Sequence, residues 1–97
     1  MRKQIWIATL LSLAPVTSIP ALAATAATCR SYARYAVEDY KLTTKANKKC
    51  RVNASPRWQD SYDNHYKWCL SAPVEAVRAE QKARDQYLLK CGARATY

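Results

Sequence analysis

The sequence predicts a small all-α protein, an up-down-up bundle of three helices stapled by two disulfides that follows an N-terminal signal peptide. The first residues have the charge and hydropathy order of an export signal. The remaining chain contains all four cysteines, and an even number of cysteines in a short exported domain indicates disulfides. Between these cysteines, apolar side chains recur at helical spacing, with proline and a single glycine as interruptions.

The signal peptide is predicted over residues 1–23. It begins with a short basic stretch, continues with an uncharged apolar stretch, and ends in the small residues Ala21 and Ala23 of a signal-peptidase site. We expect cleavage after Ala23, with a later cut within residues 24–28 as the alternative. The disulfide-stabilised helical domain then covers residues 24–97, in the periplasm or outside the cell, where disulfides form.

Two alternatives to a cleaved signal are less favoured. An uncleaved membrane anchor conflicts with Pro15 and Pro20, and only about 20 uncharged residues are available to cross a bilayer. A lipid-attached terminus at Cys29 conflicts with the absence of a leucine three residues earlier, and it would leave another cysteine without a partner. We therefore predict no transmembrane segment once the signal has been removed.

The first helix is predicted over residues 29–50, with Thr28 as its N-cap. Its two cysteines would lie about 31 Å apart along the axis, because each helical residue rises about 1.5 Å. A disulfide requires α-carbons within about 7 Å, so Cys29 cannot bond to Cys50. The predicted buried face consists mostly of apolar or small residues, namely Cys29, Tyr32, Ala33, Ala36, Val37, Tyr40, Asn47 and Cys50.

The second helix is predicted to follow a link over residues 51–55 and to run to about Leu70. Ser55 followed by Pro56 is typical of a helix start, with a hydroxyl cap and a proline in the first turn. Such a helix places one aromatic and polar stripe against its neighbours. The residues of this stripe are Trp58, Tyr62, His65 and Cys69.

The third helix is predicted to begin at Pro73 and to end at Cys91. Glu75 suits the positive end of a helix, and Gly92, the only glycine, suits a left-handed cap after its last turn. Its predicted buried stripe consists of Val77, Glu80 or Gln81, Arg84, Leu88 and Cys91.

The disulfide pairing follows from the order of the helices. Short links favour antiparallel neighbours, so the first helix begins near the end of the second, and the first and third helices end together. This arrangement favours Cys29 with Cys69 and Cys50 with Cys91, each bond contributing about 3–4 kcal/mol. The rival pairing is a two-helix hairpin that joins Cys29 to Cys91 and Cys50 to Cys69 and reduces residues 56–68 to a connector.

The single histidine, His65, stands four residues before Cys69. A zinc site usually takes cysteines two to four residues apart, and a cysteine nucleophile needs a free thiolate; neither is expected here. We therefore predict no catalytic, metal-binding or cofactor-binding residue and no enzymatic activity. His65 is expected to belong to a structural polar cluster with Asn47, Glu80 and Arg84, in which the last two stand four residues apart and can pair.

The chain is strongly basic, and the excess is uneven. Removing the signal takes two of the 16 basic residues and leaves 14 against seven acidic ones, with no acidic residue between Lys41 and Arg57. Such a cluster can bind lipid head groups or an anionic polymer. The alternative is a purely structural role, in which these side chains are solvated at a helix end and suit its negative pole. The predicted anion-binding residues are Lys41, Lys45, Lys48, Lys49, Arg51 and Arg57.

One pattern extends over nearly the whole chain after the signal: Tyr32, Ala33, Ala36 and Val37, then Arg57 and Trp58, then His65, Trp68 and Cys69, and finally Glu80, Arg84, Leu88 and Cys91. With these residues the chain resembles a group of small secreted proteobacterial proteins of unknown function. The resemblance implies export and a helical fold, and it carries no activity. This chain departs from the pattern after the second cysteine, where residues 51–54 contain no glycine.

These features predict an exported, non-enzymatic binding or envelope-associated protein. Its expected partner is an anionic component of the cell envelope or another exported protein, and the sequence contains no specific nucleic-acid motif. The alternative is a cationic effector that acts on membranes or anionic polymers. It is less favoured because the apolar stripes are expected to be used in helix packing.

Overall fold

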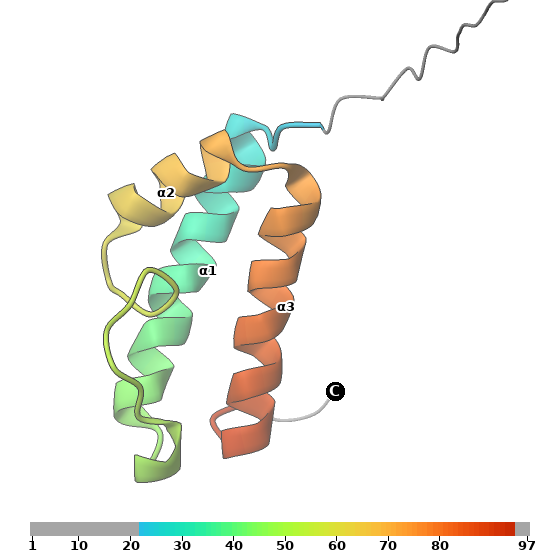
Figure 1. The fold of residues 1–97 in the computed structure, drawn as a ribbon. Helices are drawn as coiled ribbons and strands as arrows, with labels where there is room; N and C mark the ends of the chain where they lie inside the picture. The colour runs from blue at the N-terminus through green and yellow to red at the C-terminus, as the bar shows by residue number, and fades with distance from the viewer. Residues whose placement is uncertain (1–21, 95–97) are drawn as a thin grey trace, which may run out of the picture.

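In the computed structural model, residues 22–94 are described, and they fold into α1 (Ala26–Lys45), the 3-10 turn η2 (Lys48–Cys50), α2 (Tyr62–Ser71) and α3 (Val74–Cys91). The segment between η2 and α2 runs back along α1, α2 continues in that direction obliquely beside the first half of α1, and α3 then runs in the same direction as α1, which confirms the up-down-up order (Figure 1). The predicted signal peptide lies outside the described residues except for Leu22 and Ala23.

Helix α1 begins slightly earlier than predicted, with Thr25 as its N-cap instead of Thr28. The Thr25 side chain accepts a hydrogen bond from the Thr28 amide at 3.1 Å, which satisfies one of the free amides of the first turn. The first turns of the predicted face are buried, and further along the helix the buried residues are polar. Its buried residues are Cys29, Tyr32, Ala33, Ala36, Asp39 and Thr43.

Helix α1 ends at Lys45, and the predicted continuation to Cys50 is wrong. The hydroxyls of Thr43 and Thr44 bond to carbonyls of the preceding turn, and such residues weaken a helix. Asn47 then caps the separate turn η2, because its side chain accepts a hydrogen bond from an amide of that turn at 2.8 Å. The turn directs the chain toward α3 and buries the sulfur of Cys50.

The predicted start of the second helix at Ser55 and Pro56 is also wrong, because residues 51–61 form a connector without helix. Ser55 and Trp58 exchange two main-chain hydrogen bonds, at 3.0 and 3.1 Å. A serine followed by a proline is also typical of a tight β-turn, which is what these residues form. The turn packs the Trp58 ring on Tyr87 of α3, with ring centroids 5.2 Å apart.

Helix α2 starts instead at Tyr62, after the N-cap Ser61, whose side chain accepts a hydrogen bond from the Asn64 amide at 3.1 Å. Asp63 in the first turn complements the positive end of the helix. Of the predicted stripe, only His65 and Cys69 are buried side chains of this helix. Helix α2 is therefore short, and it buries one face against α1.

Helix α3 agrees with its prediction at both ends. It begins after Pro73, and Gly92 ends it with a φ of 86°, in the left-handed region that favours glycine. The amides of residues 92–94 bond to the carbonyls of Leu88 and Leu89 and so satisfy the last turn. Its buried residues are Val77, Arg84 and Leu88.

The two disulfides are Cys29–Cys69 and Cys50–Cys91, so the favoured pairing is confirmed and the hairpin pairing is wrong. Their α-carbons are 5.5 and 5.2 Å apart. The first bond joins the start of α1 to the end of α2, and the second joins η2 to the end of α3. The bonds therefore lie at opposite ends of the bundle, as the length of α1 requires.

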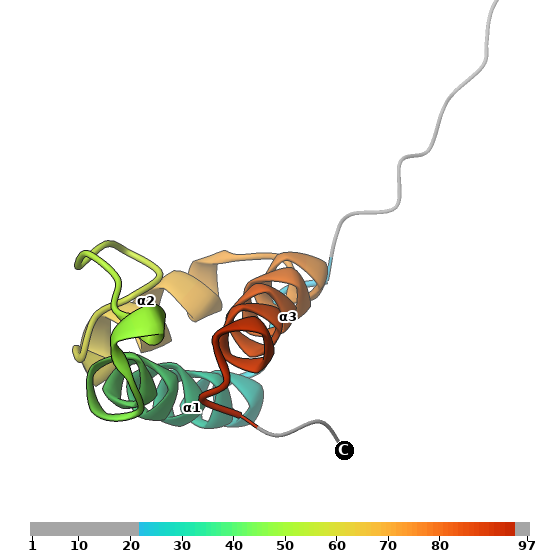
Figure 2. The ribbon, with the colours of Figure 1, turned by 90° about the horizontal axis from the view of Figure 1, so that it is seen from below.

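The core lies along α1, which packs against both α2 and α3. Seen from below, α1, α3 and the segment that leads to α2 do not lie in one plane, so they surround a common interior (Figure 2). This interior holds few large apolar side chains. One buried cluster consists of Ala24, Cys29, Tyr32, Cys69, Ala72 and Val77, with Tyr66 and Ala76 packed against it, and Leu88 and Trp58 are buried outside this cluster.

Candidate functional site

The most buried polar feature of the described chain is a charge network between α1 and α3. The Arg84 side chain is 0% exposed and that of Asp39 is 1% exposed, and Arg84 Nε lies 3.5 Å from Asp39 Oδ2. This distance gives an ion pair, although Nε itself makes no hydrogen bond. Arg94 binds the other Asp39 oxygen and also donates to Asp85 at 2.9 Å.

Tyr32 completes the surroundings of Arg84. The guanidinium carbon lies 4.6 Å from the centre of the Tyr32 ring, and Nη1 donates to the Tyr32 hydroxyl at 3.1 Å. A second nitrogen, Nη2, donates to Gln81 at 3.3 Å. Burial raises the pKa of both Tyr32 and Asp39, and for Asp39 the charges of Arg94 and Arg84 act in the opposite direction. The network therefore keeps a buried cation between one carboxylate and one aromatic face.

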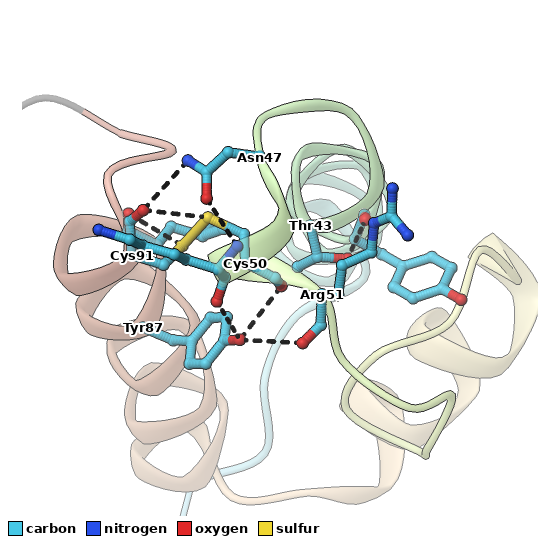
Figure 3. The surroundings of a disulfide bond; sticks show 9 residues. Thr43, Asn47, Cys50, Arg51, Tyr87 and Cys91 are labelled. Atoms are coloured by element: carbon cyan, nitrogen blue, oxygen red, sulfur yellow. Dashed lines mark hydrogen bonds between the residues drawn. A yellow bond between two sulfur atoms is a disulfide. The ribbon is translucent and has the colours of Figure 1, made fainter.

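The structure distributes the predicted polar cluster over separate places. Arg84 is in the network above, whereas Glu80 accepts two hydrogen bonds from Arg57, at 2.9 and 2.8 Å. Asn47 donates to the Cys91 carbonyl at 3.2 Å, next to the second disulfide (Figure 3). His65 bonds to the main chain of the connector through Nε2. The expected pair of Glu80 with Arg84 is replaced by the bidentate pair with Arg57.

Sequence reasoning missed the acidic half of the network. Asp39 falls on the buried face of α1, three residues after Ala36 and four before Thr43, so helical spacing could have singled it out. A carboxylate at a buried position implies a cationic partner, and Arg84 was already placed on the stripe of α3. Arg94 follows the last helix and carries no such periodic signal.

His65 is a neutral, hydrogen-bonded side chain of the interior. Its Nε2 lies 2.9 Å from the Gln59 carbonyl oxygen, which only accepts, so Nε2 carries the proton and Nδ1 is left as an acceptor. Burial lowers the pKa of His65 below its usual 6.5, and the hydrogen bond to Gln59 acts in the opposite direction. All four cysteines are in disulfides, so none offers a thiolate for the histidine to activate.

Because its pKa is lowered on folding, His65 makes stability depend on pH. The unfolded chain takes up the proton first as the pH falls toward 6.5 and below, so the contribution of His65 to the free energy of unfolding should decrease from pH 7.5 to pH 5.5, a range above that in which exposed carboxylates titrate. We expect His65→Gln to flatten this slope, as measured by urea denaturation at several pH values. An equally steep slope in the variant would contradict the assignment.

A groove with a volume of about 680 Å³ lies between the connector and α2. Residues 55–59 line it from the connector, and Asn64, His65, Lys67 and Trp68 line it from α2. Tyr32 of α1 and Glu80 of α3 also face it. We call this the aromatic groove, because Tyr32 and Trp68 lie there with ring centroids 5.5 Å apart. Among residues 22–94, no group of three or more His, Cys, Asp or Glu side chains is placed to hold a metal ion.

The predicted anion-binding residues separate into two groups. Lys45, Lys48, Lys49 and Arg51 are exposed and lie where α1 ends and η2 follows; we call this group the cationic end (Figure 1). It occupies the same end of the bundle as the Cys50–Cys91 disulfide (Figure 3). The remaining two have acidic partners, because Lys41 lies 4.0 Å from Glu38 and Arg57 is bound to Glu80 of the aromatic groove.

The fold and these sites define a small all-helical protein whose three packed helices are joined by two disulfides. Comparison of the chain with protein-family models, with curated proteins and with solved structures found no match. The resemblance to small secreted proteobacterial proteins therefore stays a prediction, and any function is argued from the geometry alone.

Proposed function

We propose that this protein is exported and acts, without catalysis, as a binding protein for a phosphate-bearing component of the cell envelope. The observation that carries the proposal is the cationic end. Four exposed cations follow one another within residues 45–51, and no acidic residue stands between positions 41 and 57. Clusters of this size attract anionic head groups and polymers by about 1 kcal/mol for each charge near the surface.

The cationic end is held in a defined shape. Cys50 is bonded to Cys91, and the Tyr87 hydroxyl donates to the Cys50 carbonyl at 3.1 Å. The two carboxylates of the charge network are both bound by Arg94, since it pairs with Asp39 and Asp85. Because the basic side chains extend from an ordered turn, less of their attraction is lost to ordering on binding.

Part of this positive charge has a structural role. Helices α1 and α3 run in the same direction and end near one another, so their negative poles lie at the cationic end (Figure 1). Each pole corresponds to about half an elementary charge. The four cations carry more positive charge than the two negative helix poles can balance. We assign the remaining positive charge to the binding of an anionic partner.

Export supports the same proposal. Two disulfides favour an oxidising compartment, and no helix among residues 22–94 is long and apolar enough to cross a membrane. Ala24 is 8% exposed and belongs to the core, so a cut after Ala23 retains it, whereas a cut further along would remove it. We therefore expect Ala24 as the first residue of the exported protein.

A membrane-disrupting effector is the less favoured function. Such a protein presents cations and apolar side chains on one surface. Two of the large exposed apolar side chains, Trp68 and Leu70, flank Cys69, whose disulfide lies at the opposite end of the bundle from the cationic end. The separation favours surface binding over insertion.

The binding proposal is tested with the exported, oxidised protein and two phosphate sources, vesicles containing phosphatidylglycerol and soluble polyphosphate. Neutral phosphatidylcholine vesicles serve as the blank. We expect Gln at positions 45, 48, 49 and 51 to lower affinity by about 5-fold for each removed charge at low salt. The two sources distinguish a lipid surface from a polymer.

The matched control removes the same charge elsewhere, with Gln in place of exposed Arg30, Arg34, Arg78 and Lys82. It should retain most of the affinity. Equal losses in the two variants would show that net charge alone is responsible, and an absence of binding to both phosphate sources would refute the proposal.

A further inference from the structure

The aromatic groove is independent of the cationic end and differs from it in charge. Its two cations are already neutralised: Arg57 makes two hydrogen bonds with Glu80, and Lys67 lies 2.9 Å from Asp63. The Arg57 pairing also lowers the pKa of Glu80, so the carboxylate is ionised and the pair stays neutral as a whole at neutral pH. An anion gains little here, because binding it would have to compete with these carboxylates.

The groove nevertheless presents both donors and acceptors. Arg84 donates to the Tyr32 hydroxyl, which therefore keeps its own proton for another acceptor. The Asn64 side chain donates to Gln59 at 2.8 Å and keeps its carbonyl oxygen as an acceptor. The Arg57–Glu80 pair retains further N–H groups and oxygen lone pairs at its edge. A ligand suited to this arrangement must both donate and accept, as a hydroxyl does.

Aromatic surface is the third property of the groove. Trp68 is 39% exposed although its ring packs beside Tyr32, so part of the indole remains open to a ligand. A volume of about 680 Å³ lies within the range of small-molecule sites, about 300–1,000 Å³. The charged and amide side chains along the walls do not suit a hydrocarbon chain, which would leave these polar groups without partners.

We propose that the aromatic groove is a second binding site, which takes a neutral sugar unit of a glycan. A pyranose ring offers apolar C–H faces for the exposed part of Trp68 and hydroxyls around its edge for the Arg57–Glu80 pair and Asn64. The ring carries no charge and so does not disturb the internal ion pairs. This site goes beyond the proposed phosphate binding, and either site can fail without the other.

The test uses the exported, oxidised protein in titrations followed by two-dimensional NMR. The probes are three neutral trisaccharides, N-acetylchitotriose, cellotriose and maltotriose, with trigalacturonic acid as the anionic comparator. We expect at least one neutral sugar to bind saturably with a Kd below about 5 mM, with shifts at residues that line the groove. Raising the salt from about 50 to about 500 mM should change this Kd by less than about 2-fold, because no net charge is involved.

Two variants locate the binding. Trp68→Ala should raise the Kd at least about 10-fold, whereas Tyr35→Ala, which removes an exposed aromatic side chain of α1, should change it less than about 2-fold. Should Trp68→Ala fold poorly, the double variant Arg57→Met with Glu80→Met removes the hydrogen-bonding groups of the polar edge without altering the net charge. It should also weaken binding about 10-fold.

Three results would overturn the proposal. One is that no neutral trisaccharide shifts the groove resonances at about 10 mM, well above the expected Kd. Another is that the Trp68 and Tyr35 variants lose affinity equally. The third is that trigalacturonic acid binds the groove more tightly and in a salt-sensitive manner, which would make it an anion site. Replacement of the four residues of the cationic end should leave sugar binding unchanged.

Discussion

Removal of both disulfides is expected to abolish folding. They join residues 40 and 41 positions apart in the sequence, and closure of loops of this length corresponds to about 4 kcal/mol for each bond. A domain of this size rarely gains more than about 3–5 kcal/mol from its hydrophobic core alone. Few large apolar side chains are buried here, so loss of one bond should remove most of the stability and loss of both should leave an unfolded chain.

Paired substitutions measure this effect without leaving a lone thiol. We expect the Cys29→Ala, Cys69→Ala variant and the Cys50→Ala, Cys91→Ala variant each to lose about 4 kcal/mol in urea denaturation followed by circular dichroism. A variant with all four substitutions serves as the control for reductant, which should then have no further effect. A cooperative transition in that variant would show that helix packing alone is sufficient.

Asp39→Ala is expected to be the most destabilising substitution outside the cysteines. It leaves the guanidinium of Arg84, 0% exposed, without its carboxylate. Removal of one partner of a buried ion pair costs about 3–5 kcal/mol, because the remaining charge stays desolvated and uncompensated. Arg94 would still be bound to Asp85, so the loss falls mainly on Arg84. Urea denaturation at neutral pH measures it.

The adjacent carboxylate provides the matched control for Asp39. Glu38 is exposed and lies 4.0 Å from Lys41, and loss of such a surface pair should change the free energy of unfolding by less than about 1 kcal/mol. The double variant Asp39→Leu, Arg84→Met replaces both charges with apolar side chains and should recover much of the loss. Comparable losses for Asp39→Ala and Glu38→Ala would contradict the role assigned to the network.

Much of the fold could be inferred from local chemistry along the chain. A single helix over most of the residues between Cys29 and Cys50 keeps these cysteines far apart, and this excluded one of the three pairings. Gly92 after the last apolar residue marked a left-handed cap because only glycine adopts that backbone without a steric cost. Helical periodicity likewise placed His65, Arg84 and Leu88 on buried faces.

Where local signals were ambiguous, long-range contacts decided between them. Ser55 and Pro56 suit both a helix start and a β-turn, and the packing of Trp58 on Tyr87 accompanies the turn. Helical periodicity was enough to place Asp39 on the buried face of α1. Its ion pair with Arg84 could not be predicted in this way, because the two residues lie far apart in the sequence. The same holds for Arg57 and Glu80, because pairing across elements depends on how helices rotate against one another.

Composition and spacing therefore determined the class of fold and the basic stretch, and they excluded one disulfide pairing, because each of these depends on neighbouring residues or on the length of one helix. The choice between the two remaining pairings was decided by the packing of the helices. The aromatic groove, the neutral pair at its edge and the buried charge network were decided only by tertiary structure. They arise where the three helices and the connector approach one another, and the energy of a buried charge depends on those surroundings more than on its position in the chain.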